Sequence, residues 1–306
     1  MKNIFVKNLP KRKSNGFDLR LFYLRDIGYS ISDVYVGQEI VEWPGIRLRD
    51  IWSNKLKRNL LYVSQDNPVN YYLKYFLHSR QFINVIQLIR VFIRQIIIHM
   101  YFYRVGYLKK DDFFLASFFS NNVLIPHCVV LFDVKKDWNV NSFKVPIRFD
   151  FWGSGNYLPN RLALTRIEEL GRQFPQFSFH VWGLEYQNSS LAKGWIDDVL
   201  IIKEYDAWAI FPLEVGSGIK NKVIESILIG VPSIGLVEAY SGIVGFNNYL
   251  GIFRNINKLR DFLDMGNIDN WRFIYESFNS CRKVFVDFYQ TQDFVKDYSY
   301  AHRDLH

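Results

Sequence analysis

The chain has 306 residues, of which 49% are hydrophobic and 18% aromatic, which is enough for two ordinary domains and excludes a disordered chain. Its formal net charge of +8 favours phosphates, anionic lipid headgroups or nucleic acid as partners, without choosing among them. No run of eighteen uncharged apolar residues occurs and the opening MKNIFVKNLPKRK lacks the apolar core of a signal peptide, so we expect neither a transmembrane helix nor a leader.

The first half of the chain begins with a predicted strand, loop, helix and strand. NIFVK (3–7) is β-rich, the turn-rich loop 8–16 contains Asn15 and Gly16, 17–28 has helical periodicity, and SISDVYVG (30–37) is a second strand candidate. Such a βαβ unit has parallel strands. Further strands are predicted at 60–66, 112–117 and 122–131, with a helical region after the first, and the polar segment 133–146 is the predicted linker.

The second half repeats this alternation. We expect strands at 147–153, 177–183, 207–212 and 232–236, and helices at 158–174, 197–205 and 221–230. Asp197 or Asp198 is the expected N-cap of the second helix, and Gly230 with Pro232 is expected to end the third. The alternation predicts an α/β protein with doubly wound parallel sheets. We place its domains at 1–140 and 141–285, followed by a helical tail over 286–306 that packs back on the first domain.

A glycine loop, GSG at 216–218, joins a predicted strand to a predicted helix. Its glycines let the backbone turn sharply and aim several N–H groups at one point, and the helix start adds its dipole. Lys220 and Lys222 add full charges, so the loop predicts a diphosphate site. From the loop alone, a glycine turn followed by two solvated lysines is an equally good interpretation. The Walker A pattern is absent, and Asn221 replaces the third glycine of a dinucleotide fingerprint.

Glu225 favours the diphosphate interpretation. On helix 221–230 the apolar side chains of Val223, Ile224, Ile227 and Leu228 form one buried stripe, and Glu225 lies on another side. A carboxylate one turn beyond a phosphate site is placed to accept hydrogen bonds from both ribose hydroxyls. The alternative is an i, i+3 ion pair with Lys222.

These residues carry a family resemblance. GSGIKNKVIESILIGVPSIG (216–235) resembles the nucleotide-sugar motif of the family-4 glycosyltransferases, in the bacterial polysaccharide branch that reads G-S-G-I-K-x-K-x-x-E. The segments 194–213, 151–167 and 1–37 are similar to other parts of that family. The resemblance implies a B-type glycosyltransferase fold, with two Rossmann-like domains facing a cleft and an abbreviated N-terminal domain.

The resemblance also implies roles for individual residues. Glu225 would hold the ribose, and Trp195 would lie against the base unless it is a core aromatic. Backbone N–H groups and nearby side chains would contact the rest of the donor; these residues are Gly153, Gly216, Ser217, Gly218, Ile219, Lys220 and Lys222. Asn15 and Gly16 would belong to a loop on the acceptor side.

Candidate catalytic residues are Asp66, Glu214 and Lys220. Many family members carry a second glutamate eight residues before the ribose glutamate; here that position is Ser217, and Glu214 is a nearby substitute. Gln65-Asp66 stands where relatives often have His-Asp at a strand end, although Asp66 is equally suited to a turn before Asn67-Pro68.

The implied activity is retaining hexosyl transfer from a nucleoside-diphosphate sugar, with uridine favoured, to a glycan or lipid-linked glycan in bacterial surface polysaccharide biosynthesis. No D-x-D or H-x-x-x-H pattern occurs, so we expect no metal and no cofactor. A degenerate member that scaffolds a biosynthetic complex is the alternative. Nucleic-acid binding rests only on the charge, because no known binding motif supports it.

FINVIQLIRVFIRQIIIHMYFYR (82–104) allows two interpretations. Its polar residues, among them Arg90, Gln95 and His99, fall near one side of a helix, as in an amphipathic core helix. The same pattern suits a surface helix in the membrane interface, whose basic residues meet anionic headgroups. We expect a cytoplasmic protein, and the second interpretation alone implies peripheral contact with the inner face of the cell membrane. Cys128 and Cys281, far apart and outside any C-x-x-C, fit a reduced compartment.

Overall fold

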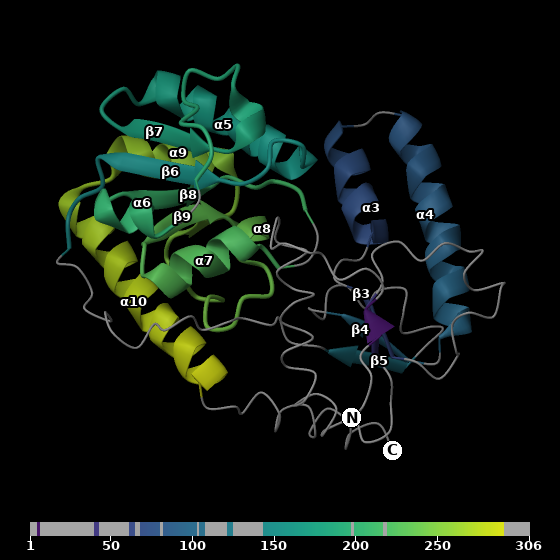
Figure 1. Ribbon diagram of the computed structural model, residues 1–306. Coiled ribbons are helices and arrows are strands. Elements are labelled where there is room, and N and C mark those ends of the chain that lie inside the picture. Colours follow the sequence, from purple (N-terminus) through teal and green to yellow (C-terminus); the bar gives the residue numbers. More distant parts are fainter. Residues whose placement is uncertain are drawn as a thin grey trace. The chain divides into compact units, whose positions relative to one another are not determined.

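The computed structural model of the chain describes residues 5–6, 40–42, 61–64, 68–79, 82–102, 104–107, 121–124, 143–196, 199–216 and 219–290 (Figure 1). The chain divides into two compact units. The first comprises residues 1–130, 217–219 and 291–306, and the second comprises 131–216 and 220–290.

The first unit contains a parallel sheet of five strands. In order across the sheet these are β1 (Phe5–Val6), β2 (Ile40–Glu42), β3 (Leu61–Ser64), β4 (Arg104–Tyr107) and β5 (Asn121–Leu124). Two helices that contact each other, α3 (Pro68–Ser79) and α4 (Phe82–Tyr101), lie between β3 and β4 in the chain. Among the described strands the order across the sheet follows the sequence order, without the reversal that a doubly wound sheet has.

The sequence predicted part of this first sheet. β1, β3 and β5 fall on predicted strands, whereas β2 was not predicted, and β4 begins at Arg104, where a helix was expected to continue. α4 instead ends at Tyr101. The predicted helix 17–28 and the predicted strands 30–37 and 112–117 lie outside the described residues.

The second unit contains a parallel sheet whose strand order is β10-β9-β8-β6-β7. Its strands are β6 (Arg148–Trp152), β7 (Ser178–Trp182), β8 (Trp208–Phe211), β9 (Ser233–Leu236) and β10 (Ile252–Phe253). Its helices are α5 (Leu158–Gln173), the 3-10 turn η3 (Leu184–Tyr186), α6 (Leu200–Glu204), α7 (Asn221–Ile229), α8 (Val237–Tyr240), α9 (Ile256–Met265) and α10 (Ile268–Gln290), the long yellow-green helix of Figure 1.

The four strands predicted in this unit are confirmed, and so are α5 and α7. α6 differs from its prediction, because it begins at Leu200 and its N-cap is Val199 rather than Asp197 or Asp198. Val199 has helical backbone angles, φ −65° and ψ −14°, which do not place a side chain to cap the first turn. α10 continues to Gln290, past the predicted boundary at 285, and the rest of the tail lies outside the described residues.

The core of this unit forms where α7 covers the sheet. Val223, Ile224, Ile227 and Leu228 are buried, which confirms the predicted stripe. Gly230 ends α7 with left-handed angles, φ 74° and ψ 28°, as predicted. The buried guanidinium of Arg282 donates to the carbonyls of Ile227 and Leu228, at 2.7 and 3.0 Å, and so satisfies two of the last carbonyls of the helix.

The strand order of the second sheet indicates where a ligand binds. β6 lies between β7 and β8, so the order reverses between β6 and β8. In open α/β sheets, ligands bind beyond the carboxyl ends of the strands at such a switch point. Trp152 and Gly153 end β6, and the segment 212–216 follows β8. The candidate site is therefore built here.

No helix in the part of the chain that the structure describes is long and apolar enough to cross a membrane.

Candidate functional site

Glu225 lies at this switch point, in the second turn of α7. Its Oε2 accepts a hydrogen bond of 2.7 Å from the indole Nε1 of Trp152, the last residue of β6. No described residue forms a hydrogen bond with Oε1. Burial raises the pKa of Glu225, against the opposing effects of the Trp152 hydrogen bond and the charge of Lys222. The strand and the helix thus hold one carboxylate oxygen of Glu225 in place.

Lys222, three residues before Glu225, packs against the protein. Its Nζ donates to Asn160 Oδ1 and lies 4.1 Å from the centroid of the Phe151 ring. Burial lowers its pKa to about 7, and the charge of Lys220 acts in the same direction, against that of Glu225. Near neutral pH, an anion that binds beside Lys222 therefore favours its protonated form, and a cation favours its neutral form. The interpretation of Lys222 as a solvated lysine is wrong.

Lys220 is also engaged by the protein. It is the N-cap of α7, its side chain is 6% exposed, and its Nζ lies 3.3 Å from Glu238 Oε1. A lysine side chain has no acceptor atom and cannot cap a helix, and a cation is unfavourable at a helix N-terminus. Glu238 offsets this cost with an opposite charge. Lys220 therefore is not a solvated lysine either, and its charge is shared with a carboxylate.

The loop after β6 is held in place by Asn160 and Glu185. Asn160, in the first turn of α5, accepts from Lys222 and donates through Nδ2 to Ser154 O at 2.7 Å. Glu185 accepts from the backbone N–H of Gly155 and from Asn156 Nδ2, each at 2.9 Å. Gly153 has a φ of +144°, and a Cβ there would lie 2.7 Å from both Asn160 Nδ2 and Lys222 Nζ. Only glycine allows this close approach.

Glu214 belongs to a neighbouring set of ion pairs. Its Oε2 accepts from Arg166 Nε and Nη2 at 3.2 and 3.1 Å. Arg166 also pairs with Glu169, which in turn accepts from Arg260 at 2.7 Å. The carboxylate proposed to replace the family's second glutamate thus has its charge balanced by an arginine of α5.

The remaining predicted residues are placed as follows. Trp195 is 53% exposed, so the interpretation as a core aromatic is wrong, and its contact with a base stays a prediction. Gly216 lies beside Lys220, because a Cβ on it would be 3.0 Å from Lys220 Nζ, and Ile219 is buried. Asn15, Gly16, Asp66, Ser217 and Gly218 lie outside the described residues. Within the described ranges, no group of three His, Cys, Asp or Glu side chains is arranged to hold a metal.

Sequence reasoning missed Trp152 and Asn160. Both lie beside the loop at 153–155 that follows β6, and each contacts a residue of α7 more than sixty positions away. The one available signal was their position, since a side chain at the end of the first strand or in the first turn of the next helix faces the carboxyl edge of the sheet.

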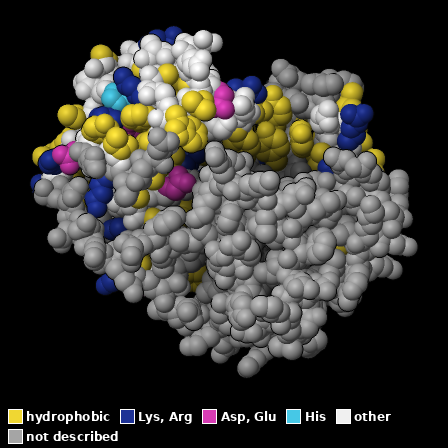
Figure 2. All heavy atoms as spheres, viewed as in Figure 1, with side chains coloured by type: hydrophobic (Ala, Val, Ile, Leu, Met, Phe, Trp, Pro, Cys, Tyr) yellow, Lys and Arg dark blue, Asp and Glu magenta, His cyan; other side chains and the backbone are white. Residues whose placement is uncertain are grey.

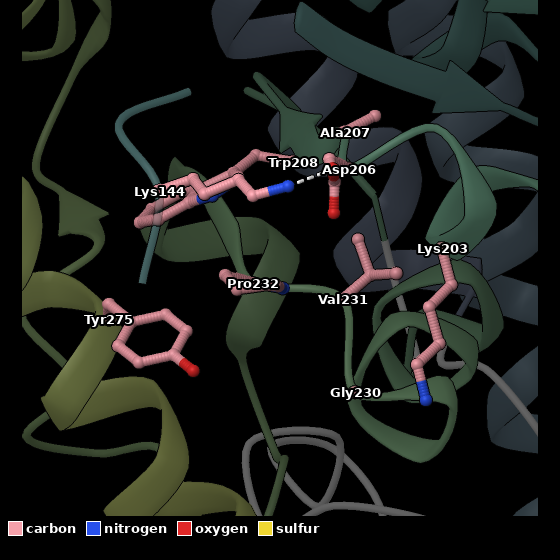
Figure 3. Close-up of a pocket in the computed structure, with 9 residues that line it drawn as sticks. All are labelled: Lys144, Lys203, Asp206, Ala207, Trp208, Gly230, Val231, Pro232 and Tyr275. Carbon is pink, nitrogen blue, oxygen red and sulfur yellow. Dashed lines mark hydrogen bonds and ion pairs between the residues drawn. The ribbon is translucent and has the colours of Figure 1, made fainter. Parts of the chain in front are cut away.

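A small pocket of about 40 Å³ lies at the opposite edge of this sheet (Figure 3). Trp208, the first residue of β8, and Pro232, just before β9, contribute to its wall, together with Tyr275 of α10. Lys144 forms an ion pair with Asp206 at its rim. This volume suits a water molecule or two rather than a sugar or nucleotide. It lies at the amino ends of the strands, away from Glu225.

Comparison with solved structures identifies the fold. No protein-family model and no curated protein matches the chain. A mutant of S. aureus TarM, in complex with fondaparinux, α-GlcNAc-glycerol and UDP, matches with a TM-score of 0.53 and 13% identity over 78% of this chain and 49% of that one. The chain therefore spans about half the length of the TarM chain, and the likeness shows an α/β fold shared with TarM.

Two further structures match less well. The pneumococcal O-GlcNAc transferase GtfA, in complex with UDP and GlcNAc, has a TM-score of 0.47 and 12% identity over 91% of this chain and 60% of that one. The Glycosylation Associate Protein (Gap123) complex from Streptococcus agalactiae has a TM-score of 0.41 and 11% identity over 88% of this chain and 56% of that one.

Proposed function

We propose that the chain is a glycosyltransferase of the B-type fold that binds a nucleoside-diphosphate sugar at the switch point of its second sheet. The observation that carries the proposal is the Glu225 carboxylate, held by Trp152 through one oxygen at the carboxyl edge of β6 and β8. A shared fold with TarM, which was crystallised with UDP, supports a nucleotide as the ligand. Glu225 Oε1 accepts hydrogen bonds from the ribose hydroxyls in this proposal.

The chemistry needed at such a site is the stabilisation of negative charge on the departing diphosphate. In this proposal the N-terminus of α7 and the backbone N–H groups of 216–219 would bind this charge, with Lys220 and Lys222 beside it. Diphosphate binding raises the pKa of Lys222 above about 7, because an anion stabilises its ammonium form. Trp195 lies against the base, and Asp66, Glu214 and Lys220 are the candidate catalytic residues. Transfer is retaining and needs no metal in this proposal.

The proposed acceptor is a glycan or lipid-linked glycan of a bacterial surface polysaccharide, and the proposed donor is a UDP-sugar. Membership of family 4 rests on the GSGIKNKVIE motif at 216–225. We place the enzyme in the cytoplasm. Contact with an anionic membrane surface is a separate proposal, which rests on α3 and α4 rather than on this site.

A scaffold without transferase activity is the second candidate function. It is favoured by the internal pairing of the charges, since Lys220 pairs with Glu238 and Glu214 with Arg166. A site whose cations are already neutralised attracts a diphosphate less strongly than one with open charges. In this case the fold is retained while the donor is bound weakly and not consumed.

Calorimetric titration of the chain with UDP tests the proposal. We expect binding that Glu225→Gln weakens by about 5- to 30-fold, because the amide keeps a neutral hydrogen bond and loses only the charge-assisted part, about 1–2 kcal/mol. Glu276→Gln, on the exposed side of α10, is the matched control and should bind as the wild type does. Equal affinity of the two variants contradicts the site.

Incubation with UDP-sugars separates the two functions. Release of free sugar, or transfer to an added glycan, supports the enzyme and excludes the scaffold. Nucleotide binding without release or transfer favours the scaffold, and absence of nucleotide binding contradicts the proposed site altogether.

A further inference from the structure

The polarity of α4 is inverted relative to an ordinary core helix. Gln95 and His99 are only 3% and 1% exposed, and they share the buried face with Ile98. Ile86, Ile89, Ile93 and Met100 are instead 40–61% exposed. Their spacing of three, four and seven residues places them on one face of the helix. Gln95 and His99, on the polar side of the helix, thus face the protein interior rather than water.

The buried polar residues Gln95 and His99 do not place a charge in the protein interior. Burial lowers the pKa of His99 to about 4, so its imidazole is neutral at physiological pH. A neutral histidine and a glutamine fit a protein interior that supplies hydrogen bonds. The buried face of α4 can therefore carry Gln95 and His99 while the isoleucines on the other face are exposed.

α3 extends the exposed apolar surface. It contacts α4 and exposes Leu73 and Leu77, which lie one turn apart and therefore on one face. Phe92 of α4 is also exposed. Figure 2 shows hydrophobic side chains gathered over these helices, with basic side chains beside them. Large contiguous apolar surfaces of this kind mark contact with a protein or a membrane.

The charges on the two helices select between these partners. Neither α3 nor α4 contains an aspartate or a glutamate, and their charged residues are Lys74, Arg90 and Arg94. Arg90 is exposed on the flank of the isoleucine face. A second copy of this chain would bring the same cations together across a two-fold interface. An anionic bilayer complements both features, because it accepts the apolar side chains and attracts the cations.

We propose that the exposed faces of α3 and α4 form a membrane-docking surface that lies in the interface of an anionic lipid bilayer. In this arrangement α4 runs parallel to the membrane plane, with the side chains of Ile86, Ile89, Ile93 and Met100 at the acyl boundary. Arg90 reaches the headgroups from the flank of the helix, its stem covering apolar surface. The surface lies on the first unit and does not depend on the nucleotide site of the second.

Flotation of the full chain with lipid vesicles tests the surface. We expect binding to phosphatidylcholine vesicles that contain 30% phosphatidylglycerol, and weaker binding as salt is raised, since headgroup attraction is screened. Ile89→Asp/Ile93→Asp should weaken binding by at least about 10-fold, because each buried apolar side chain contributes more than 1 kcal/mol. Arg90→Gln should weaken it by about five-fold, the effect of one basic residue at an anionic surface.

Two controls keep the result interpretable. Ile268→Asp/Phe273→Asp changes two residues of α10 whose exposure is close to that of Ile89 and Ile93, and should bind vesicles as the wild type does. Circular dichroism and the urea midpoint establish that each variant is folded, and Ile89→Gln/Ile93→Gln replaces the aspartate pair if that pair unfolds the chain.

Three results would overturn the proposal. The first is failure of the wild type to bind vesicles with phosphatidylglycerol, and the second is equal loss of binding in the α4 and α10 double variants. The third is a dimer, seen by sedimentation velocity, that Ile89→Asp/Ile93→Asp dissociates in a chain that binds no vesicles. That outcome would assign the surface to a second copy of the chain.

Discussion

Replacement of Trp152 by phenylalanine isolates the contact that positions Glu225. The substitution removes the indole N–H that donates to Glu225 Oε2 at 2.7 Å and keeps an aromatic ring on β6. Trp152 is buried and packs edge to face against Phe211, with ring centroids 5.2 Å apart. The smaller ring therefore also leaves a cavity, whose cost has to be separated from that of the lost hydrogen bond.

The charge of Glu225 determines the size of the effect. A hydrogen bond to an ionised group contributes about 1.5–3 kcal/mol, and one between neutral groups about 0.5–1.5 kcal/mol. Burial raises the pKa of Glu225, so the folded chain holds this proton more tightly than the unfolded chain, and stability falls as pH rises through the folded pKa. Loss of the Trp152 donor raises that pKa further. The cost of Trp152→Phe should therefore grow with pH.

A double-mutant cycle measures this pH dependence. Urea denaturation of the wild type, Trp152→Phe, Glu225→Gln and the double variant gives a coupling free energy from which the cavity cost cancels. We expect the coupling to grow with pH, as more of the carboxyl group is ionised, toward about 1–2 kcal/mol, the difference between charged and neutral hydrogen bonds. At pH 4 the carboxyl group is protonated and resembles the amide of glutamine, so the coupling should fall close to zero.

Two outcomes would refute this reasoning. A coupling that is the same at pH 4 and pH 8 would mean that the ionised form of Glu225 gains nothing from Trp152. A coupling that is larger at pH 4 than at pH 8 would mean that Trp152 favours the protonated carboxyl group over the ionised one.

Two further predictions concern the residues around Glu225. The pKa of Lys222 is lowered to about 7, so between pH 7 and 10.5 the unfolded chain binds more protons than the folded chain, and the stability of the wild type should rise with pH. In urea denaturation, Lys222→Met should remove up to about 1.4 kcal/mol per pH unit of this rise. An unchanged slope of stability against pH would contradict the burial of Lys222. Gly153→Ala should destabilise the chain by about 3 kcal/mol or more in the same assay, because backbone strain at φ +144° adds to the clash with Asn160 and Lys222. The control Gly194→Ala, with φ +83° and no atom within 4 Å, should cost only the backbone strain, about 1–2 kcal/mol. Equal costs would show that the surroundings of Gly153 move to accommodate the methyl group.

Local pattern predicted much of the second unit. The spacing of Val223, Ile224, Ile227 and Leu228 identified the buried face of α7, and Gly230 identified its end, because helical periodicity and the left-handed preference of glycine act within a few residues. Placement of Glu225 away from that stripe followed from the same periodicity. The same approach failed at α6, where two aspartates indicated an N-cap but Val199 occupies the position.

The contacts of the candidate site required the tertiary structure. Trp152 and Glu225, which form a hydrogen bond, are 73 residues apart in sequence, and Lys220 and Glu238 are 18 apart. No local sequence pattern predicts either pair. The interpretation of Lys220 and Lys222 depends on these contacts, because the sequence around a lysine near a glycine loop is the same whether its side chain is solvated or buried. Strand order is equally inaccessible, and it is the order of β6 and β8 that locates the switch point.

The sequence by itself determined that this protein alternates strands with helices, that α7 follows a glycine loop, and that Glu225 lies off the buried stripe of α7. These properties depend on residues a turn or two apart. Only the tertiary structure decided which side of α4 faces water and which groups neutralise the lysines. Burial is a property of all the elements that pack around a residue, so the pattern of α4 specified two faces and the remaining chain selected the one that is exposed.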